Sequence, residues 1–379
     1  MVSRRKLLAG MAVGIAAAGT GAYFKLKPQP VEVGFSLTAD ELAAAQRFLQ
    51  TYPVIDCHAH PGRTFVRDAQ NLAWKMKLYS MTGTFEEATV SDMKAGGVSA
   101  AVFSGVADFQ LLDLAGGAPG AVREFQEGES WDSYQRQIQN IKQLQADGLI
   151  VIVRTAADVH ATHAAGTPAA FLGMEGADFL DNDIDRLQSV YDDGLRMITL
   201  VHYHNNTLGD ITTGTLGKRG LTEFGREVVS GMNDLGIVID VAHASQQTAF
   251  DALEASTRPV VLSHTHINSP AYSHPRFVSG ELAGAVAASG GYVGAWPAGL
   301  GIDTLAGFVD RIEELVEVLG EDHVALGSDM DANYKPVLDT YRKMPLVIGA
   351  LTKRGYSDQT IAKFTSGNFL RVMNEVQAG

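Results

Sequence analysis

From about residue 54, short apolar runs alternate along the chain with longer segments of helical spacing. Segments such as 222–236 and 305–320 carry apolar residues three and four positions apart, and each ends at a glycine, which predicts amphipathic helices. Strands that alternate with helices predict a parallel sheet. We identify nine strand candidates, at 54–60, 98–106, 149–154, 170–176, 197–204, 237–245, 260–266, 291–297 and 323–331.

Nine strands are one more than a (β/α)8 barrel contains, so we interpret 149–154 as an accessory strand. An open doubly wound sheet is the rival architecture, but no glycine-rich phosphate turn follows the first strand. The pattern therefore predicts an α/β fold, a (β/α)8 TIM barrel that spans residues 41–379.

Ionisable side chains end almost every predicted strand. In a (β/α)8 barrel the carboxyl ends of all strands open on one face, so residues far apart in sequence converge there. Imidazoles and carboxylates are the ligands that zinc-like ions favour. A single histidine after a strand is more often structural, but repetition at several strand ends favours a metal site. The residues are His58, His60, Glu175, His202, His243, His264, His266 and Asp329.

His58 and His60 are two positions apart on one strand, so both side chains point to one side and can share a cation. We assign no role to His204 and His266, because each follows a stronger candidate by two positions. The remaining histidines fit ordinary surface or loop positions. They are His160, His163, His274 and His323.

Composition narrows the function classes. The 379 residues are 46% hydrophobic, which is enough for a large buried core. A net charge of −13 argues against a nucleic-acid partner, because phosphate binding needs a basic surface. The single cysteine, Cys57, excludes an intramolecular disulfide framework.

The first 24 residues read as a twin-arginine-type export signal. Arg4 and Arg5 lie within Ser3–Leu8, and no charge follows from Leu7 to Phe24. The alternative is an uncleaved N-terminal membrane anchor, since 18 uncharged residues could just cross a bilayer. Residues 25–40 read as a linker. We expect a periplasmic or extracellular protein. The sequence of the signal does not decide whether it is cleaved or retained.

Several longer segments carry a family resemblance. The chain resembles the membrane (renal) dipeptidase family of metal-dependent amidohydrolases from about residue 50 to its end. The segments are "GMEGAD" (173–178), "LVHYHNNTLGD" (200–210), "GLTEFGREVVSGMNDLGIVIDVAHAS" (220–245), "LSHTHINS" (262–269), "HPRFVSGEL" (274–282), "VALGSDMDA" (324–332) and "SGNFLRV" (366–372).

The resemblance implies an amidohydrolase-type (β/α)8 barrel with two zinc or other divalent ions. By position, it places one ion on His58 and His60 and the second on His243 and His264, with Glu175 as the bridging carboxylate. Two such cations activate a bridging water, so the implied reaction is hydrolysis of a dipeptide amide by a metal-bridged hydroxide.

The resemblance also assigns residues to substrate and proton transfer. His202 would contact the substrate or its developing oxyanion, Arg276 would bind the substrate carboxylate, and Asp329 would handle the proton of the attacking water. Asp56 would act in support of the metal ligands or structurally.

Three departures from the family pattern concern the pocket. The first strand reads His-x-His where the family has His-x-Asp, so His60 removes one negative charge. The segment "DMDANY" replaces the common Asp-Phe-Asp-Gly, and "GAWPAGLG" lacks the polar and aromatic residues expected near the substrate. The substrate could therefore differ from a simple dipeptide.

Three hypotheses follow. The first is an exported zinc dipeptidase, favoured by the presence of Arg276. The second is a related amidohydrolase that acts on another amide, ester or lactone. The third is a non-catalytic relative that binds a ligand, which Asp329 and Glu175 disfavour. The expected partners are a dipeptide or other small molecule and the twin-arginine export machinery, while membrane anchoring and a homodimer stay open.

Overall fold

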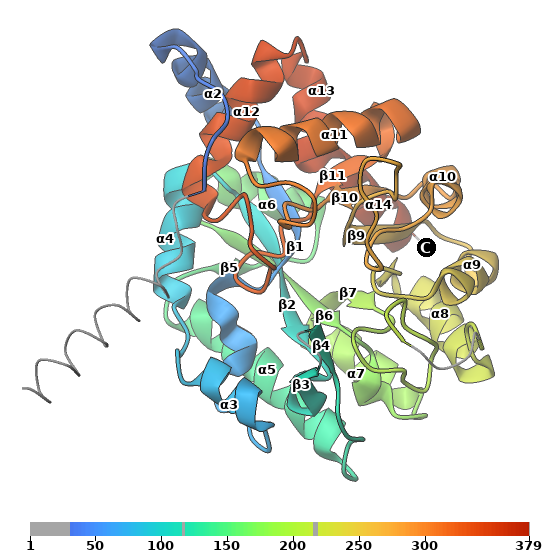
Figure 1. Ribbon diagram of the computed structural model, residues 1–379. Helices are drawn as coiled ribbons and strands as arrows, with labels where there is room; N and C mark the ends of the chain where they lie inside the picture. The colour runs from blue at the N-terminus through green and yellow to red at the C-terminus, as the bar shows by residue number, and fades with distance from the viewer. Residues whose placement is uncertain (1–30, 116–117, 215–218, 379) are drawn as a thin grey trace, which may run out of the picture.

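A computed structural model describes residues 31–115, 118–214 and 219–378. Helices and strands alternate around a central sheet (Figure 1). None of the helices in this described part combines the length and hydrophobicity that a bilayer crossing requires. The predicted export signal, residues 1–24, and the first part of the predicted linker, 25–30, lie outside the described residues.

Eight parallel strands form the barrel, in the order β1-β2-β6-β7-β8-β9-β10-β11. Closure comes from β1 and the segment after β11, where Ala59 bridges Met330 and the His60 amide donates to the Met330 carbonyl at 2.9 Å. The strands are β1 (Ile55–Ala59), β2 (Ala100–Val106), β6 (Ala169–Glu175), β7 (Leu195–Thr199), β8 (Val238–Asp240), β9 (Val260–Thr265), β10 (Val293–Ala295) and β11 (Val324–Leu326).

The helices surround the sheet and separate successive strands (Figure 1). The predicted segment 222–236 forms α8, capped by the Thr222 side chain and ended by Gly236 at φ 75°, a left-handed conformation that favours glycine. The helices are α2 (Ala39–Thr51), α3 (Trp74–Ser80), α4 (Glu86–Gly96), α5 (Glu129–Ala146), α6 (Ala156–Ala164), α7 (Asp185–Asp193), α8 (Glu223–Leu235), α9 (Gln246–Ala255), α10 (Gly280–Ala288), α11 (Leu305–Leu319), α12 (Met344–Lys353), α13 (Asp358–Ala362) and α14 (Asn368–Gln377).

All nine predicted strands are present, and the (β/α)8 prediction is confirmed. The accessory strand 149–154 is β5 (Val151–Ile152), which pairs only with the first residues of β6. β7 takes the same edge of β6 from Leu172 onward, so β5 stays outside the barrel. One element was not predicted: an antiparallel hairpin of β3 (Leu112–Ala115) and β4 (Ala118–Ala121), which follows β2.

The barrel interior is a packed core. One buried cluster takes apolar residues from every barrel strand or from the position next to it, including Cys57, Phe171 and Tyr292. Phe369 and Met373 of α14 join this cluster, and the Phe369 ring lies 5.1 Å from that of Phe171. A core of this kind leaves the opposite end, where the strands finish, for the functional side chains.

The second half of the predicted linker packs against the barrel. Leu305 and Ala306, at the start of α11, donate backbone hydrogen bonds to the carbonyls of Glu32 and Val33. Phe35 packs on the main hydrophobic core, and Thr38 caps α2. Residues 31–38 therefore belong structurally to the barrel domain.

Candidate metal centre

The Glu175 carboxylate lies at the centre of the site. It ends β6 and is buried where the carboxyl ends of the neighbouring strands meet. Five imidazoles surround it through their Nε2 atoms, at 3.5, 2.9 and 3.4 Å from Oε1 for His58, His243 and His264, and at 3.4 and 3.3 Å from Oε2 for His60 and His202.

Asp329 completes this group from the segment after β11. Its Oδ1 lies 3.4 Å from the Nε2 atom of His60. Asp329 and His243 both have positive φ values, 54° and 68°, although neither is glycine. Such conformations cost energy and persist only where the surrounding structure imposes them, so both side chains are held toward the centre at the expense of local strain.

Neighbouring groups orient two of the imidazoles. The Nδ1–H of His60 donates to the Ser104 carbonyl at 2.8 Å. The Nδ1–H of His264 donates to the Ser263 hydroxyl at 2.9 Å, and that hydroxyl donates to Asp240 at 2.6 Å. Each contact places a proton on Nδ1, so the neutral form of either ring presents its Nε2 lone pair to the centre, which is the arrangement that metal-binding histidines need.

His202 has a partner that the sequence did not reveal. Its Nδ1 lies 2.6 Å from Oδ1 of Asp108, a fully buried carboxylate just beyond β2, whose Oδ2 accepts the Tyr203 amide at 2.9 Å. Burial lowers the pKa of His202, but the charges of Asp108 and Glu175 outweigh it and raise that pKa. Asp108 therefore orients the imidazole and favours its charged form.

The electrostatics suit cation binding. Burial would raise the pKa of Glu175, but the imidazoles of His202, His243 and His58 hold that pKa well below its usual value. Burial keeps the pKa of His243 and His264 well below normal, so both are neutral, as metal ligands must be. Although burial opposes it, Asp329 and Glu175 raise the pKa of His60 to about 10, which shows that this position attracts positive charge.

The donor set fits divalent metal ions. Within the described residues, the buried Nε2 atoms of His58 and His60 have no hydrogen-bond partner, a costly arrangement unless another group satisfies them. Three overlapping groups bring their ligand atoms within 4.8 Å of one another. They are His58, His60 and Asp329; His58, Glu175 and His264; and Glu175, His202 and His243.

Arg276 lies beside this group. Its Nη2 donates to Nε2 of His264 at 3.0 Å, and its guanidinium carbon lies 5.2 Å from the ring centre of Trp296. Its buried Nε has no partner in the described part of the chain. Trp296 comes from "GAWPAGLG", so our expectation that this segment lacks an aromatic residue near the substrate was wrong.

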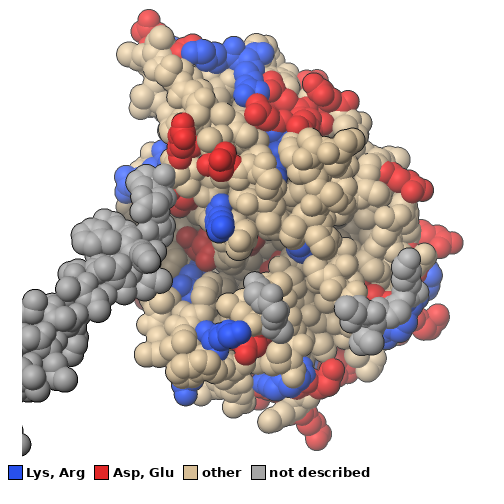
Figure 2. All heavy atoms as spheres, in the orientation of Figure 1, with Lys and Arg blue, Asp and Glu red and all other residues tan. Residues whose placement is uncertain are grey.

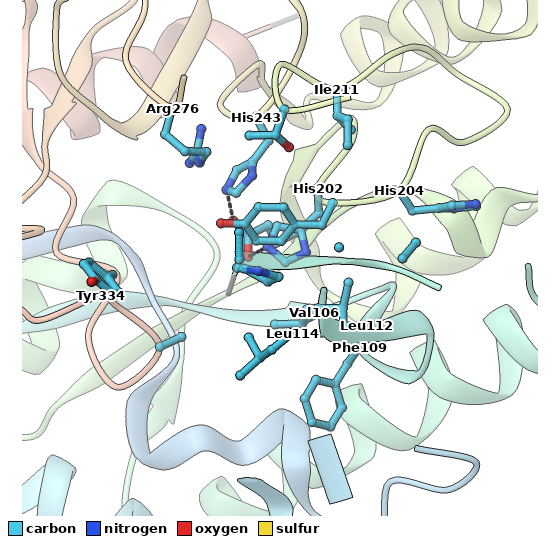
Figure 3. A pocket seen from close by; sticks show the side chains of 18 of the residues that line it. Val106, Phe109, Leu112, Leu114, His202, His204, Ile211, His243, Arg276 and Tyr334 are labelled. Atoms are coloured by element: carbon cyan, nitrogen blue, oxygen red, sulfur yellow. Dashed lines mark ion pairs between the residues drawn. The ribbon is translucent and has the colours of Figure 1, made fainter. Parts of the chain in front are cut away.

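A pocket of about 1580 Å³ is lined by Glu175, Asp329, Arg276 and four of the five imidazoles, those of His60, His202, His243 and His264. Figure 2 shows the corresponding face hollowed near its centre, with Lys and Arg side chains scattered among acidic and uncharged ones. Figure 3 shows His202 and His243 at the middle of the pocket and Arg276 on one side of them. Of the residues predicted for metal, substrate or proton transfer, all but His58 line this one cavity, and His58 lies directly against Glu175 and His264.

The other histidines lie outside the group around Glu175. His163 contacts Ser99, and His323 contacts the Gly291 carbonyl. His204 lies between Asp178 and Glu124, and His266 pairs with Glu314. His274 lines the pocket and accepts the Arg276 amide, while His160 lies exposed on α6.

Asp56 is structural. Its carboxylate accepts hydrogen bonds from the Ser328 and Tyr341 hydroxyls and from the His58 amide. These contacts join β1 to the segment after β11 and support the strand that carries His58.

Comparisons with known proteins find dipeptidases among the similar sequences. Dipeptidase verJ of Clonostachys rogersoniana is 32% identical over 233 residues, 60% of each chain. Dipeptidase tcpJ of Claviceps purpurea is 31% identical over 252 residues, 63% of this chain and 58% of that relative. The match thus spans about three fifths of these relatives' length.

Solved structures support the fold. A metallo peptidase from Rhodobacter sphaeroides, liganded with a phosphinate mimic of the dipeptide L-Ala-D-Ala, superimposes with a TM-score of 0.70 at 23% identity, covering 86% of this chain and 99% of that one. The probable dipeptidase PvdM from Pseudomonas aeruginosa gives 0.71 at 19% identity, covering 90% and 100%.

The family model described as membrane dipeptidase (peptidase family M19) matches residues 42–379, nearly the whole barrel domain. The match includes every residue of the metal centre and Arg276. The groups of histidine and acid ligand atoms described above agree with the divalent metal that this metallopeptidase family implies. The chain belongs to the membrane dipeptidase family, peptidase family M19.

Proposed function

We propose that this protein is an exported, metal-dependent dipeptidase. The observation that carries the proposal is the Glu175 carboxylate surrounded by five imidazoles, with Arg276 on one side and Asp329 on another. These groups can hold cations, a substrate carboxylate and a mobile proton in one pocket. The dipeptidases among its relatives support the same substrate class.

Two divalent ions, zinc first among them, are the proposed cofactors. His58 and His60 would hold one ion, His243 and His264 the other, and Glu175 would lie between them. Bound there, such ions polarise a carbonyl and lower the pKa of water toward neutrality. His60 in place of an acid lowers the negative charge of the first site, so we expect weaker retention of the ion there.

Three side chains act on the substrate. Asp329, buried beside His60, takes the proton of the attacking water and returns it to the leaving amine. His202, oriented by Asp108, donates a hydrogen bond from Nε2 to the oxygen that becomes negative. Arg276 binds the free carboxylate of the leaving amino acid through its planar donors, one of which has no partner within the described chain.

The carboxylate assignment has a direct test. The metal-loaded protein should cleave a dipeptide but reject the same dipeptide as its C-terminal amide, and Arg276→Lys should narrow that difference, because lysine lacks the planar fork. Arg219→Lys is the matched control, since Arg219 lines the same pocket but is paired with Asp210 at 2.8 Å. Equal rates on acid and amide would favour an amidohydrolase with another substrate.

Export remains part of the proposal. Arg4 and Arg5 support a twin-arginine signal, which carries folded proteins and so permits metal loading before transport. Replacing both with lysine should retain the protein in the cytoplasm, whereas Lys6→Arg should leave transport intact. Unchanged fractionation of the double variant would remove the signal assignment.

A further inference from the structure

A row of neighbouring side chains connects the cationic Arg276 to the apolar part of the pocket. At one end the Arg276 guanidinium contacts His264 and Trp296. The His264 ring stacks on His58 with centres 4.1 Å apart, and His58 lies 5.0 Å from His60. Arg276 at the cationic end of the pocket is therefore next to the imidazoles that we propose as metal ligands.

The same line continues beyond His60 into apolar side chains. The Phe65 ring packs edge-on against His60 with centres 5.3 Å apart, and Phe109 packs on Phe65 at 5.0 Å. We call this part of the pocket the apolar arm and define it by Phe65, Met76, Val106, Phe109, Leu112 and Leu114. Figure 3 shows Val106, Phe109, Leu112 and Leu114 gathered on the side of the centre away from Arg276.

Four separate elements build the arm. They are the turn after β1, helix α3, the end of β2 with its following turn, and strand β3 of the unpredicted hairpin. Apolar surface continues to the pocket mouth, where Leu114 is 40% and Val122 is 52% exposed. Exposed apolar side chains that line a cavity mark a surface for an apolar ligand.

The carboxylates of the pocket lie outside the arm, whereas the Lys75 ammonium donates to the backbone carbonyl of Leu114 at the arm's exposed end. Among the described lining residues the carboxylates are Glu124, Glu175 and Asp329, and none belongs to the arm. A polar or charged group buried among the arm's side chains would lose water, and those apolar side chains offer it no hydrogen-bond partner. The volume of about 1580 Å³ also exceeds the roughly 300–1,000 Å³ of ordinary small-ligand pockets, so a bulky group fits.

We propose that the apolar arm is the subsite for the residue on the acyl side of the scissile amide, and that it takes a large apolar or aromatic side chain. The inference rests on the proposed function, in which Arg276 fixes the carboxylate end. With that end fixed and the carbonyl at Glu175, the acyl-side residue extends past His60 toward Phe65. The substrate class is then a dipeptide with a large apolar N-terminal residue.

Matched peptides test the direction. With the metal-loaded protein, kcat/KM for Phe-Gly should exceed that for Ala-Gly by roughly 10–100-fold, the range that extra apolar groups contribute in a fitting pocket. Asp-Gly should be poorer than Ala-Gly, and Gly-Phe should show no comparable gain. Equal values for Phe-Gly and Ala-Gly, or an equal gain for Gly-Phe, would overturn the assignment.

Two substitutions test the location. Leu114→Asp places a charge in the arm at a partly exposed position, so it should reduce the ratio of Phe-Gly to Ala-Gly to below about 3-fold. Val318→Asp is the matched control, because Val318 is 58% exposed on α11 and does not line the pocket. An unchanged ratio in Leu114→Asp, or the same fall in both variants, contradicts the proposal.

Calorimetric binding separates this inference from the proposed function. If no peptide is hydrolysed, the dipeptidase proposal fails, but tighter binding of Phe-Gly than Ala-Gly, lost in Leu114→Asp, still supports the arm. Turnover of N-octanoylglycine in place of all dipeptides would support the arm and overturn the dipeptide assignment. Equal binding of both dipeptides would overturn the arm alone.

Discussion

Asp108 should control catalysis through His202. In the Asp108→Asn variant the amide oxygen must still accept the Tyr203 amide, so the NH2 group faces His202 Nδ1. The Nδ1 atom of His202 then accepts a hydrogen bond from the amide, so the ring is neutral and carries its proton on Nε2. The hydrogen bond to the developing oxyanion remains, but its donor is now a neutral imidazole instead of a charged one.

The magnitude follows from that change. A hydrogen bond to a charged group is worth about 1.5–3 kcal/mol and a neutral one about 0.5–1.5 kcal/mol, so the charge contributes about 1–1.5 kcal/mol. This corresponds to a loss of roughly 5–13-fold in kcat/KM for Asp108→Asn, because 1.36 kcal/mol is tenfold in rate. His202→Ala removes the whole contact and should cost roughly 10–150-fold.

The assay is a double-mutant cycle on a dipeptide substrate, with Asp178→Asn as control. Asp178 holds His204 at the same 2.6 Å, but His204 faces Glu124 rather than Glu175. The double variant of Asp108 and His202 should be no worse than His202→Ala alone, and Asp178→Asn should stay within about 3-fold of wild type. Additive losses, or an equal loss in the control, would refute the reasoning.

Three further predictions concern proton transfer, metal content and stability. Asp329→Asn should keep its metal yet lower turnover by roughly 10²–10⁴-fold, as loss of a general acid–base does, and near-normal kcat would move that role elsewhere. Glu175→Ala should lose at least one of about two ions per chain by elemental analysis, whereas His163→Ala should keep both; one ion before and after would show a mononuclear site. His204, whose pKa Asp178 raises to about 9 against burial, stabilises the folded protein fully below its unfolded pKa of about 6.5. That stabilisation is lost as pH rises through about 9, so the free energy of unfolding should fall over this range by on the order of 1–3 kcal/mol, and Asp178→Asn should flatten the slope in denaturant titrations at several pH values. An unaltered slope would contradict this coupling.

The barrel and the group around Glu175 were predictable from two features of the sequence: the regular alternation of apolar runs with helical segments, and the ionisable residues at the ends of those runs. Apolar runs marked every strand, and parallel strands share one carboxyl end, so His58, Glu175 and His264 had to converge once the barrel was inferred. The accessory role of β5 followed because nine strands were predicted and a (β/α)8 barrel contains eight. Assignment of individual roles depended on family motifs, since geometry alone does not separate a ligand from a substrate-binding histidine.

Other parts of the structure near the site have no regular sequence pattern that would predict them. Asp108 lies two residues past its strand, in a turn where an acid is unremarkable. The β3–β4 hairpin has four-residue strands, one of them "APGA", too short and too poor in β-branched residues to be recognised. Arg311 lies in a helical segment, yet it is fully buried and donates to the carbonyls of Trp296 and Ala298.

The central claim is that metal held around Glu175 makes this chain a dipeptidase. The most direct measurement is the rate of Phe-Gly hydrolysis by chelator-stripped protein as zinc is returned in known equivalents. We predict negligible hydrolysis without metal and a rise to a plateau near two ions per chain. Full activity in the stripped protein, or none at any zinc content, would contradict the account.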